Sequence, residues 1–203
     1  MATSTDDPAR AVDGLVSVAR LLDEPRLARV YTHTLRAGPV TVDDLVAELD
    51  LPRTTAYADT GTLVDLGLLD RDDSQKTHRF TAEPIHLTAT LYGDTYTVTP
   101  TLVAAVGQTA TDDDLELLVE RHGLGTLAAA LTYAVPYAEG RLSERVAARE
   151  LDVQMAFGIA ALQALRSLLA ETRAFDPYVD EIGRGRPAAD TDSAAGTDSQ
   201  TGS

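Results

Sequence analysis

The stretch from Gly38 to Thr81 constrains the fold of this chain more than any other. Two helical patterns, Val42–Leu49 and Arg53–Leu66, are separated only by Asp50-Leu51-Pro52. A proline this close to the start of a helix, preceded by so few residues, is typical of a tight turn between two separate helices. Leu68–Arg71 and Thr77–Thr81 then read as two strands around a turn. The segment therefore predicts a helix, a tight turn, a helix and a β-hairpin.

The residues before this stretch predict two further helices. They lie between Asp13 and Ala37 and are joined at Asp23-Glu24-Pro25. Gly38-Pro39 ends the second of them. Thr41 with Asp44 three residues later is typical of a helix N-cap. The apolar residues of the first helix recur at helical spacing, and they are Val12, Leu15, Val16, Ala19 and Leu22.

This order of elements is that of a winged helix-turn-helix domain. The residues GPVTVDDLVAELDLPRTTAYADTGTLVDLGLLDRDD and the later THRF resemble winged-helix transcriptional regulators of the broad archaeal ArsR/TrmB/MarR-like kind. The resemblance covers about Val12 to Thr81. It implies a domain that binds double-stranded DNA and regulates transcription.

The same resemblance indicates where DNA contacts are expected. A helix that enters the major groove needs short polar side chains near its start, and the candidates are Arg53, Thr54, Thr55, Tyr57 and Thr60. A wing that follows the phosphate backbone needs cations, and the candidates are Arg71, Lys76, His78 and Arg79. Three alternatives stay open. Arg53 could be a solvated residue at a helix start, and Tyr57 could belong to the core. The wing cations could pair with Asp70, Asp72 and Asp73 across the hairpin.

The charge of the chain bears on this expectation. Its 203 residues hold 32 acids and 17 bases, for a net charge of −15, and Lys76 is the one lysine. Residues 38–82 alone carry nine acids and four bases. Such an excess argues against nucleic acid in dilute buffer. However, abundant aspartate with arginine in place of lysine resembles the proteome of a salt-loving archaeon. At about 1 M salt the Debye length is only about 3 Å, so net charge then says little about partners.

The second half of the chain is expected to be mostly helical after a hairpin formed by Ile85–Tyr92 and Thr95–Val98. Ala147–Leu168 aligns without gaps on Leu45–Leu66, which lies 102 residues earlier. This internal repeat predicts a degenerate helix-turn-helix that has lost its polar face; a chance likeness of two helix pairs is the alternative. Its apolar residues are assigned to dimerisation, and they are Met155, Phe157, Ile159 and Leu162.

Features of catalysis are not found in the sequence. There is no cysteine, and the four histidines stand apart without metal-ligand spacing. No phosphate loop, dinucleotide fingerprint or catalytic acid pair stands out. Asp112, Asp113 and Asp114 read as a solvated helix cap. We therefore expect no enzyme, no cofactor and no metal.

We predict a mainly α protein with small β-hairpins. The expected parts are disordered residues 1–10, a winged helix-turn-helix at 11–83, a helical dimerisation or regulatory domain at 84–182 that contains the degenerate helix-turn-helix, and a disordered tail at 183–203. We expect a sequence-specific transcriptional regulator that acts as a cytoplasmic homodimer with an unidentified effector, without signal peptide or membrane span. The alternative is a winged-helix interaction module without DNA contact, similar to the kleisin-binding subunits of chromosome-segregation complexes.

Overall fold

The computed structural model describes residues 8–91 and 94–182. The elements in these two ranges follow one another in the order α1 (Pro8–Asp23), α2 (Pro25–Ala37), α3 (Val42–Leu49), α4 (Arg53–Asp65), β1 (Asp70–Asp72), β2 (Arg79–Thr81), β3 (Leu87–Leu91), β4 (Asp94–Val98), α5 (Pro100–Gln108), α6 (Asp113–His122), α7 (Leu124–Ala138), α8 (Glu144–Arg149), α9 (Met155–Thr172) and the 3-10 helix η1 (Val179–Glu181). This confirms the predicted fold class: the protein is mostly helical, with two small antiparallel sheets of two strands each.

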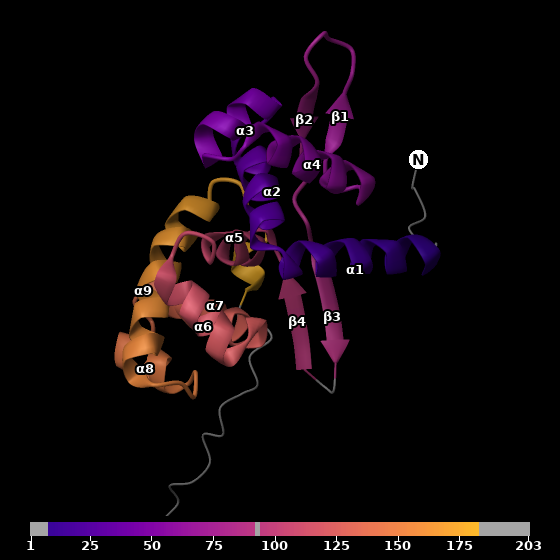
Figure 1. Ribbon diagram of the computed structural model, residues 1–203. Coiled ribbons are helices and arrows are strands. Elements are labelled where there is room, and N and C mark those ends of the chain that lie inside the picture. Colours follow the sequence, from indigo (N-terminus) through magenta and orange to yellow (C-terminus); the bar gives the residue numbers. More distant parts are fainter. Residues whose placement is uncertain (1–7, 92–93, 183–203) are drawn as a thin grey trace, which may run out of the picture.

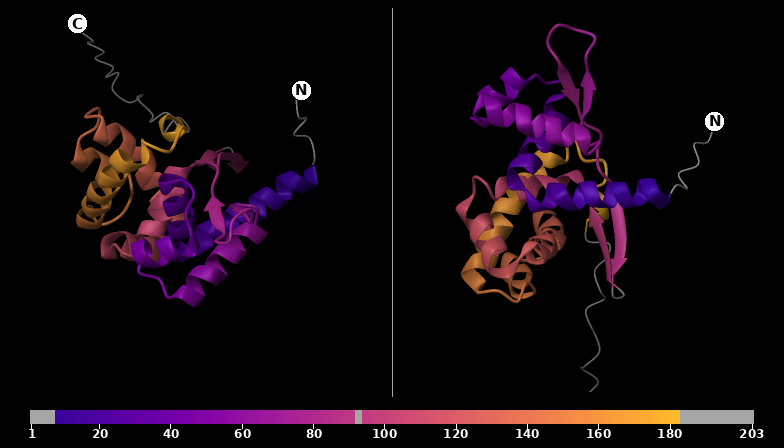
Figure 2. Two further views of the ribbon diagram at one scale, coloured as in Figure 1. Left: turned by 90° about the horizontal axis from the view of Figure 1, so that it is seen from above. Right: turned by 45° about the vertical axis from the view of Figure 1, so that its right-hand side comes forward.

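The elements group at two ends of the molecule, with α2 between them (Figure 1). Helices α3 and α4 and the β1–β2 hairpin lie at one end, and α6 to α9 lie at the other. Helix α1 and the β3–β4 hairpin both extend away from the helical body, as the turned views also show (Figure 2). The helix-turn-helix and its wing are therefore held out on one side of the molecule.

The first helix differs from its prediction in two ways. It begins at Pro8, within the stretch expected to be disordered, while residues 1–7 and the predicted tail from 183 lie outside the described residues. Its face toward the body is formed by Ser17, Val18 and Leu21. The apolar stripe read from the sequence lies mostly on the opposite, exposed side, because α1 has two apolar faces and only one of them meets α2 and α5.

The wing contains a strand residue that the sequence did not reveal. Val40 pairs with Phe80 of β2: the Val40 N–H donates to the Phe80 carbonyl at 3.0 Å, and the Phe80 N–H donates to the Val40 carbonyl at 2.8 Å. A single residue between Pro39 and Thr41 is too short to show strand periodicity. This bridge ties the segment before α3 to the hairpin after α4, and both residues are buried.

Helix α2 joins the two halves through the core. Its most extensive packing is against α5, and the closest approach is at Gly107. A Cβ at Gly107 would lie 3.0 Å from the Arg29 backbone nitrogen and 3.2 Å from the Ala28 carbonyl carbon. The buried apolar residues form one cluster from Leu21 to Ile182 that crosses the predicted boundary at Glu83-Pro84. The domain limits therefore stay a prediction.

The internal repeat appears in the backbone. Asp50 and Asp152 are the two non-glycine residues with positive φ in the described part of the chain, at 52° and 51°. Helices α4 and α9 each begin three residues later. The residues just before these helices, Pro52 and Gln154, have nearly the same backbone angles. The α8–α9 pair thus has the local geometry of a helix-turn-helix.

Gly107→Ala is expected to lower the free energy of unfolding by about 1–3 kcal/mol, because the added methyl group presses on the α2 backbone. Gly61→Ala is the matched control. Gly61 is also in a helix but has open space around it, so alanine there should raise stability by about 0.5–1 kcal/mol. Denaturant titration of both variants measures the two signs. Equal effects would contradict the close α2–α5 contact.

Candidate nucleic-acid interface

The start of α3 is fixed by a capping box. The Thr41 N–H and hydroxyl both donate to Asp44 Oδ2 at 2.8 Å, and the Asp44 N–H donates back to Thr41 Oγ1 at 3.3 Å. These hydrogen bonds lower the pKa of the Asp44 carboxyl. The predicted N-cap is confirmed, and it sets where the helix-turn-helix begins.

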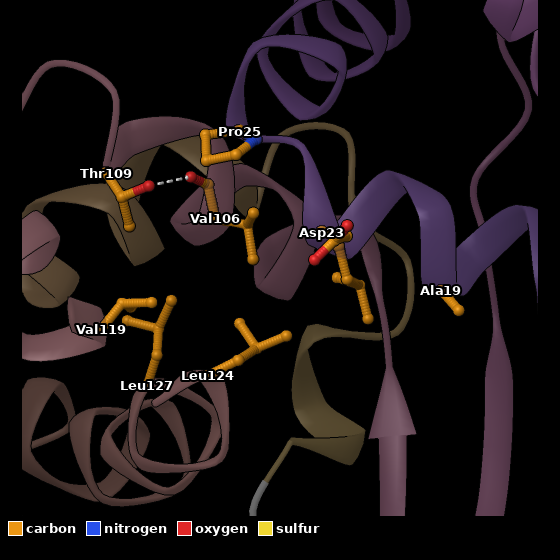
Figure 3. Close-up of a pocket in the computed structure, with 9 residues that line it drawn as sticks. Ala19, Asp23, Pro25, Val106, Thr109, Val119, Leu124 and Leu127 are labelled. Atoms are coloured by element: carbon orange, nitrogen blue, oxygen red, sulfur yellow. Dashed lines mark hydrogen bonds between the residues drawn. The ribbon is translucent and has the colours of Figure 1, made fainter. Parts of the chain in front are cut away.

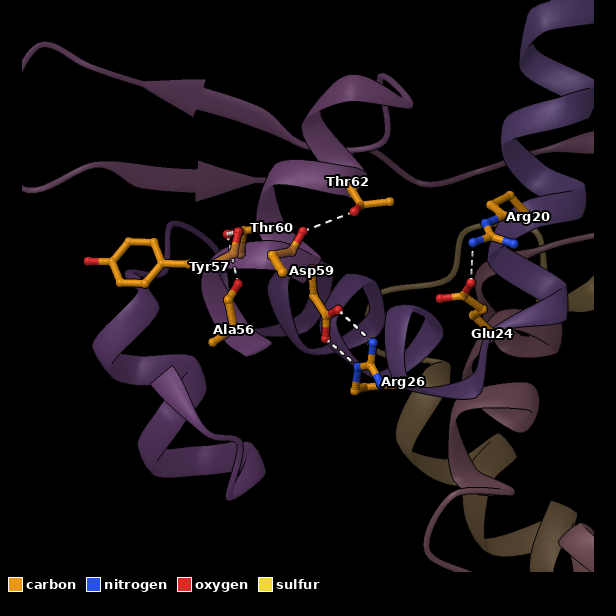
Figure 4. Close-up of polar contacts among 9 residues, drawn as sticks. Arg20, Glu24, Arg26, Ala56, Tyr57, Asp59, Thr60 and Thr62 are labelled. Carbon is orange, nitrogen blue, oxygen red and sulfur yellow. Dashed lines mark hydrogen bonds and ion pairs between the residues drawn. The ribbon is translucent and has the colours of Figure 1, made fainter. Parts of the chain in front are cut away.

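The orientation of α4 is fixed by a partly buried ion pair with α2. Arg26 Nε donates to Asp59 Oδ2 at 2.7 Å, and Arg26 Nη2 donates to Asp59 Oδ1 at 3.1 Å (Figure 4). Asp59 is only 2% exposed. The hydrogen bond and the charge of Asp59 raise the pKa of the Arg26 guanidinium. The two-pronged contact turns one side of α4 toward α2 and leaves the other side free.

The free side of α4 is narrow and carries no carboxylate over its first turns. It consists of Thr54, Tyr57, Ala58 and Gly61, which recur at helical spacing and are exposed. The Tyr57 side chain is 54% exposed and points away from the protein (Figure 4). Tyr57 therefore lies at the surface and not in the core. The helix ends in a second acid, Asp65, beyond this stretch.

Thr60 has to be removed from the predicted contacts. It is 1% exposed, and its hydroxyl donates to the Ala56 carbonyl at 2.8 Å. Thr55 is half-buried at the edge of the free side. Sequence reasoning missed Ala58 and Gly61, which have no polar side chain to signal a role. Their small size keeps the middle of α4 open to a close neighbour.

Arg53, at the first position of α4, already has a partner. Its guanidinium forms an ion pair with Asp43 of α3, and both side chains are exposed. This contact ties the two helices together across the turn. An exposed pair of this kind contributes little to stability, so Arg53 can be drawn to a phosphate without a large cost to the fold.

The wing divides its cations into two groups. Asp73 accepts from Arg71 at 2.9 Å and from His78 at 2.8 Å, so the pairing alternative describes these two. Lys76 and Arg79 are exposed, and within the described ranges neither forms an ion pair. The pKa of Asp72 is lowered by the hydrogen bonds from Ser74 and, less, by the charge of Arg79. Lys76 and Arg79 are thus the wing cations free to meet phosphate.

The proposed apolar face of α9 is smaller than predicted. Leu162 is fully buried and therefore not open to a partner, and Ile159 is half-buried against the core. Phe157 is half-buried under the Arg121 guanidinium, 5.2 Å from the ring centre. Met155 remains, at 40% exposed. The repeat predicts the helices correctly, but α9 turns most of its apolar residues inward.

Comparison with known protein families gives one match in each half of the chain. Residues 34–73 match the IclR helix-turn-helix domain. The match extends from the end of α2 through α3, α4 and β1, and it supports a helix-turn-helix transcriptional regulator that binds DNA. Residues 109–174 match DUF7437, a family of unknown function. Neither the curated proteins nor the solved structures include a match to this chain.

The aspartate cluster at the start of α6 forms a helix cap, as predicted. The carboxylate of Asp112 caps α6 by accepting from the N–H groups of Asp114 and Leu115 at 3.1 Å, as expected for the aspartate cluster. In residues 8–91 and 94–182, no group of acids and histidines is placed to hold a metal ion. No helix of these ranges has both the length and the apolar character to cross a membrane.

Arg26→Ala is expected to destabilise the protein by about 1–3 kcal/mol, because it leaves the buried Asp59 carboxylate without a partner. The cost stays below that of a fully buried pair because Arg26 is half exposed. Arg26→Ala/Asp59→Ala should cost less than Arg26→Ala alone, since the uncompensated charge is gone. Thermal or urea unfolding of the three variants tests this; additive costs would show that the pair does not hold α4.

Proposed function

We propose that this protein is a sequence-specific DNA-binding transcriptional regulator in which α4 enters the major groove. The observation that carries the proposal is the free side of α4. In a chain with 32 acids, this side has no carboxylate from Arg53 to Gly61, because the one acid in that stretch is buried against Arg26. The ion pair that orients α4 therefore also leaves its outer side free of negative charge over these residues.

The chemistry of the free side suits a base edge and a phosphate. The Thr54 hydroxyl can donate and accept, and Tyr57 offers a flat apolar ring with a polar tip. No side chain caps the first turn of α4, so its N–H groups are open to a phosphate oxygen. The small Ala58 and Gly61 allow the helix to approach the groove floor. The wing, through Lys76 and Arg79, would follow the backbone nearby.

The finer parts of the proposal rest on composition and resemblance. The acidic, lysine-poor composition supports a cytoplasm of high salt, as in salt-loving archaea, where phosphate repulsion is screened. The ArsR/TrmB/MarR-like type remains part of the proposal, as does a homodimer, because one small reading helix contacts few base pairs. An effector would best fit the groove between α2, α5 and α9, where Arg29 and Arg36 face it. Arg29 also donates to the Leu49 carbonyl at the end of α3, at 3.4 Å.

Two kinds of variant are expected to weaken DNA binding differently. Lys76→Ala and Arg79→Ala should weaken binding to all sequences alike and reduce the salt dependence of log K by about one unit each. Tyr57→Ala should weaken the preferred site by about 1–3 kcal/mol with little change on unrelated DNA. Fluorescence anisotropy over a series of KCl concentrations measures both effects.

Arg149→Ala is the control for these measurements. Arg149 is an exposed arginine on α8, at the other end of the molecule. Binding that responds to Arg149→Ala as much as to Lys76→Ala would contradict the assignment of the wing. Binding unchanged in Tyr57→Ala, Lys76→Ala and Arg79→Ala would favour the alternative, an interaction module that grips another protein with this fold.

A further inference from the structure

The outer side of α1 is an apolar surface that nothing in the described chain covers. Val12 is 57% exposed, Leu15 49% and Val16 58%. Among the described residues five large apolar side chains are exposed, and these are three of them. Their spacing places them on one stripe of the helix. Helix α1 extends away from the helical body (Figure 1), and the exposed fractions show that these three side chains are open to solvent.

The stripe leads into a hollow in the body of the protein. Ala19 and Leu22 continue the stripe and also line this hollow, which has a volume of about 370 Å³ (Figure 3). Its other apolar walls come from α5, α6 and α7, and Asp23 lies at its edge. An apolar helix laid along α1 would therefore meet a continuous surface, with a recess at one end.

We propose that α1 pairs in antiparallel orientation with α1 of a second copy of this chain. The inference specifies the surface of the homodimer in the proposed function and rests on it. The occupant is identified by charge. Asp13 and Arg20 carry opposite charges and lie two helical turns apart on one flank of the stripe.

A two-fold axis across the helices between Val16 and Ser17 brings this flank against itself in reverse. Asp13 then lies opposite the partner's Arg20, and Arg20 lies opposite the partner's Asp13. A parallel pair would place the two flanks on opposite sides of the interface and form neither contact. The charges of one helix are thus complementary to the same helix turned around.

The apolar residues pair about nearly the same axis, half a residue further along the helix, at Ser17. Leu15 lies against the partner's Ala19, a large side chain against a small one. Val12 lies against the partner's Leu22, at the hollow. Burial of these side chains in a partner removes an exposed stripe that a monomer would leave in water. Both ends of the pairing are equivalent, as an isologous interface requires.

Charge exchange between two variants tests the pairing without DNA. Asp13→Arg places two arginines on the flank, and Arg20→Asp places two aspartates there. Each variant alone should dissociate at least about tenfold more readily than the unchanged full chain, because both ion pairs become repulsive. An equimolar mixture should recover a heterodimer of near wild-type affinity. Sedimentation equilibrium at moderate salt measures all four samples.

Recovery in the mixture separates pairing from misfolding, since a misfolded chain would not be rescued by its partner. The mixture also controls for the ion pairs of Arg20 with Asp23 and Glu24 of its own chain, which Arg20→Asp removes in both the single variant and the mixture. A monomeric wild-type chain, or single variants that associate as well as the wild type, would overturn the inference. Because no DNA is present, these results stand apart from those for α4.

Leu15→Glu and Met155→Glu form a second, matched pair. Both residues are exposed, so neither substitution disturbs the core. Leu15→Glu should abolish the dimer, and Met155→Glu should leave it unchanged. The reverse result would place the interface on α9 and overturn the assignment to α1.

Discussion

The packing of α2 against α5 is the contact on which the rest of the structure depends. At Gly107 the two backbones approach so closely that the absence of a side chain is what permits the contact. On its other side, α2 holds α4 through Arg26 and Asp59. One helix therefore positions α4 relative to the helical half. Helix α1 packs against α2. If α1 pairs between two copies, α2 would therefore fix the position of α4 relative to the dimer interface.

The net charge of the chain is less informative about DNA binding than the positions of the acidic residues in the structure. Acids occupy α3, the wing turn and the start of α6, where they cap helices or pair with arginines. The middle of α4 is spared, because Asp59 is turned inward and neutralised. The net charge of −15 thus coexists with an outer side of α4 that exposes no acid from Arg53 to Gly61, and with two exposed wing cations, Lys76 and Arg79. For DNA to approach, the repulsion between its phosphates and the remaining exposed acids would have to be screened by salt.

Much of the helix-turn-helix could be predicted because its signals are local. The Thr41–Asp44 cap, the Asp50-Leu51-Pro52 turn and the Gly38-Pro39 stop each depend on residues a few positions apart. The internal repeat also gave the start of α9 correctly. These features need no knowledge of the tertiary structure.

The exposed face of α4 could not be predicted, because the helix itself has small and polar residues on every side and therefore no clear apolar stripe. Its rotation is decided by Arg26, which lies 33 residues from Asp59 in the sequence. For this reason Thr60 was assigned outward while Ala58 and Gly61 were missed. Helix α1 has apolar residues on two faces, and the sequence does not say which of them meets the body. Both errors concern rotation about a correctly placed helix axis.

The central claim is that α4 reads DNA, and mapping the DNA bound by the full-length protein in cells tests it most directly. Cross-linking followed by sequencing should give discrete peaks at promoters, with a shared motif that has two-fold symmetry, and the peaks should be lost in Tyr57→Ala. Uniform coverage of the genome, or purification with a large protein assembly and no enriched DNA, would contradict the claim.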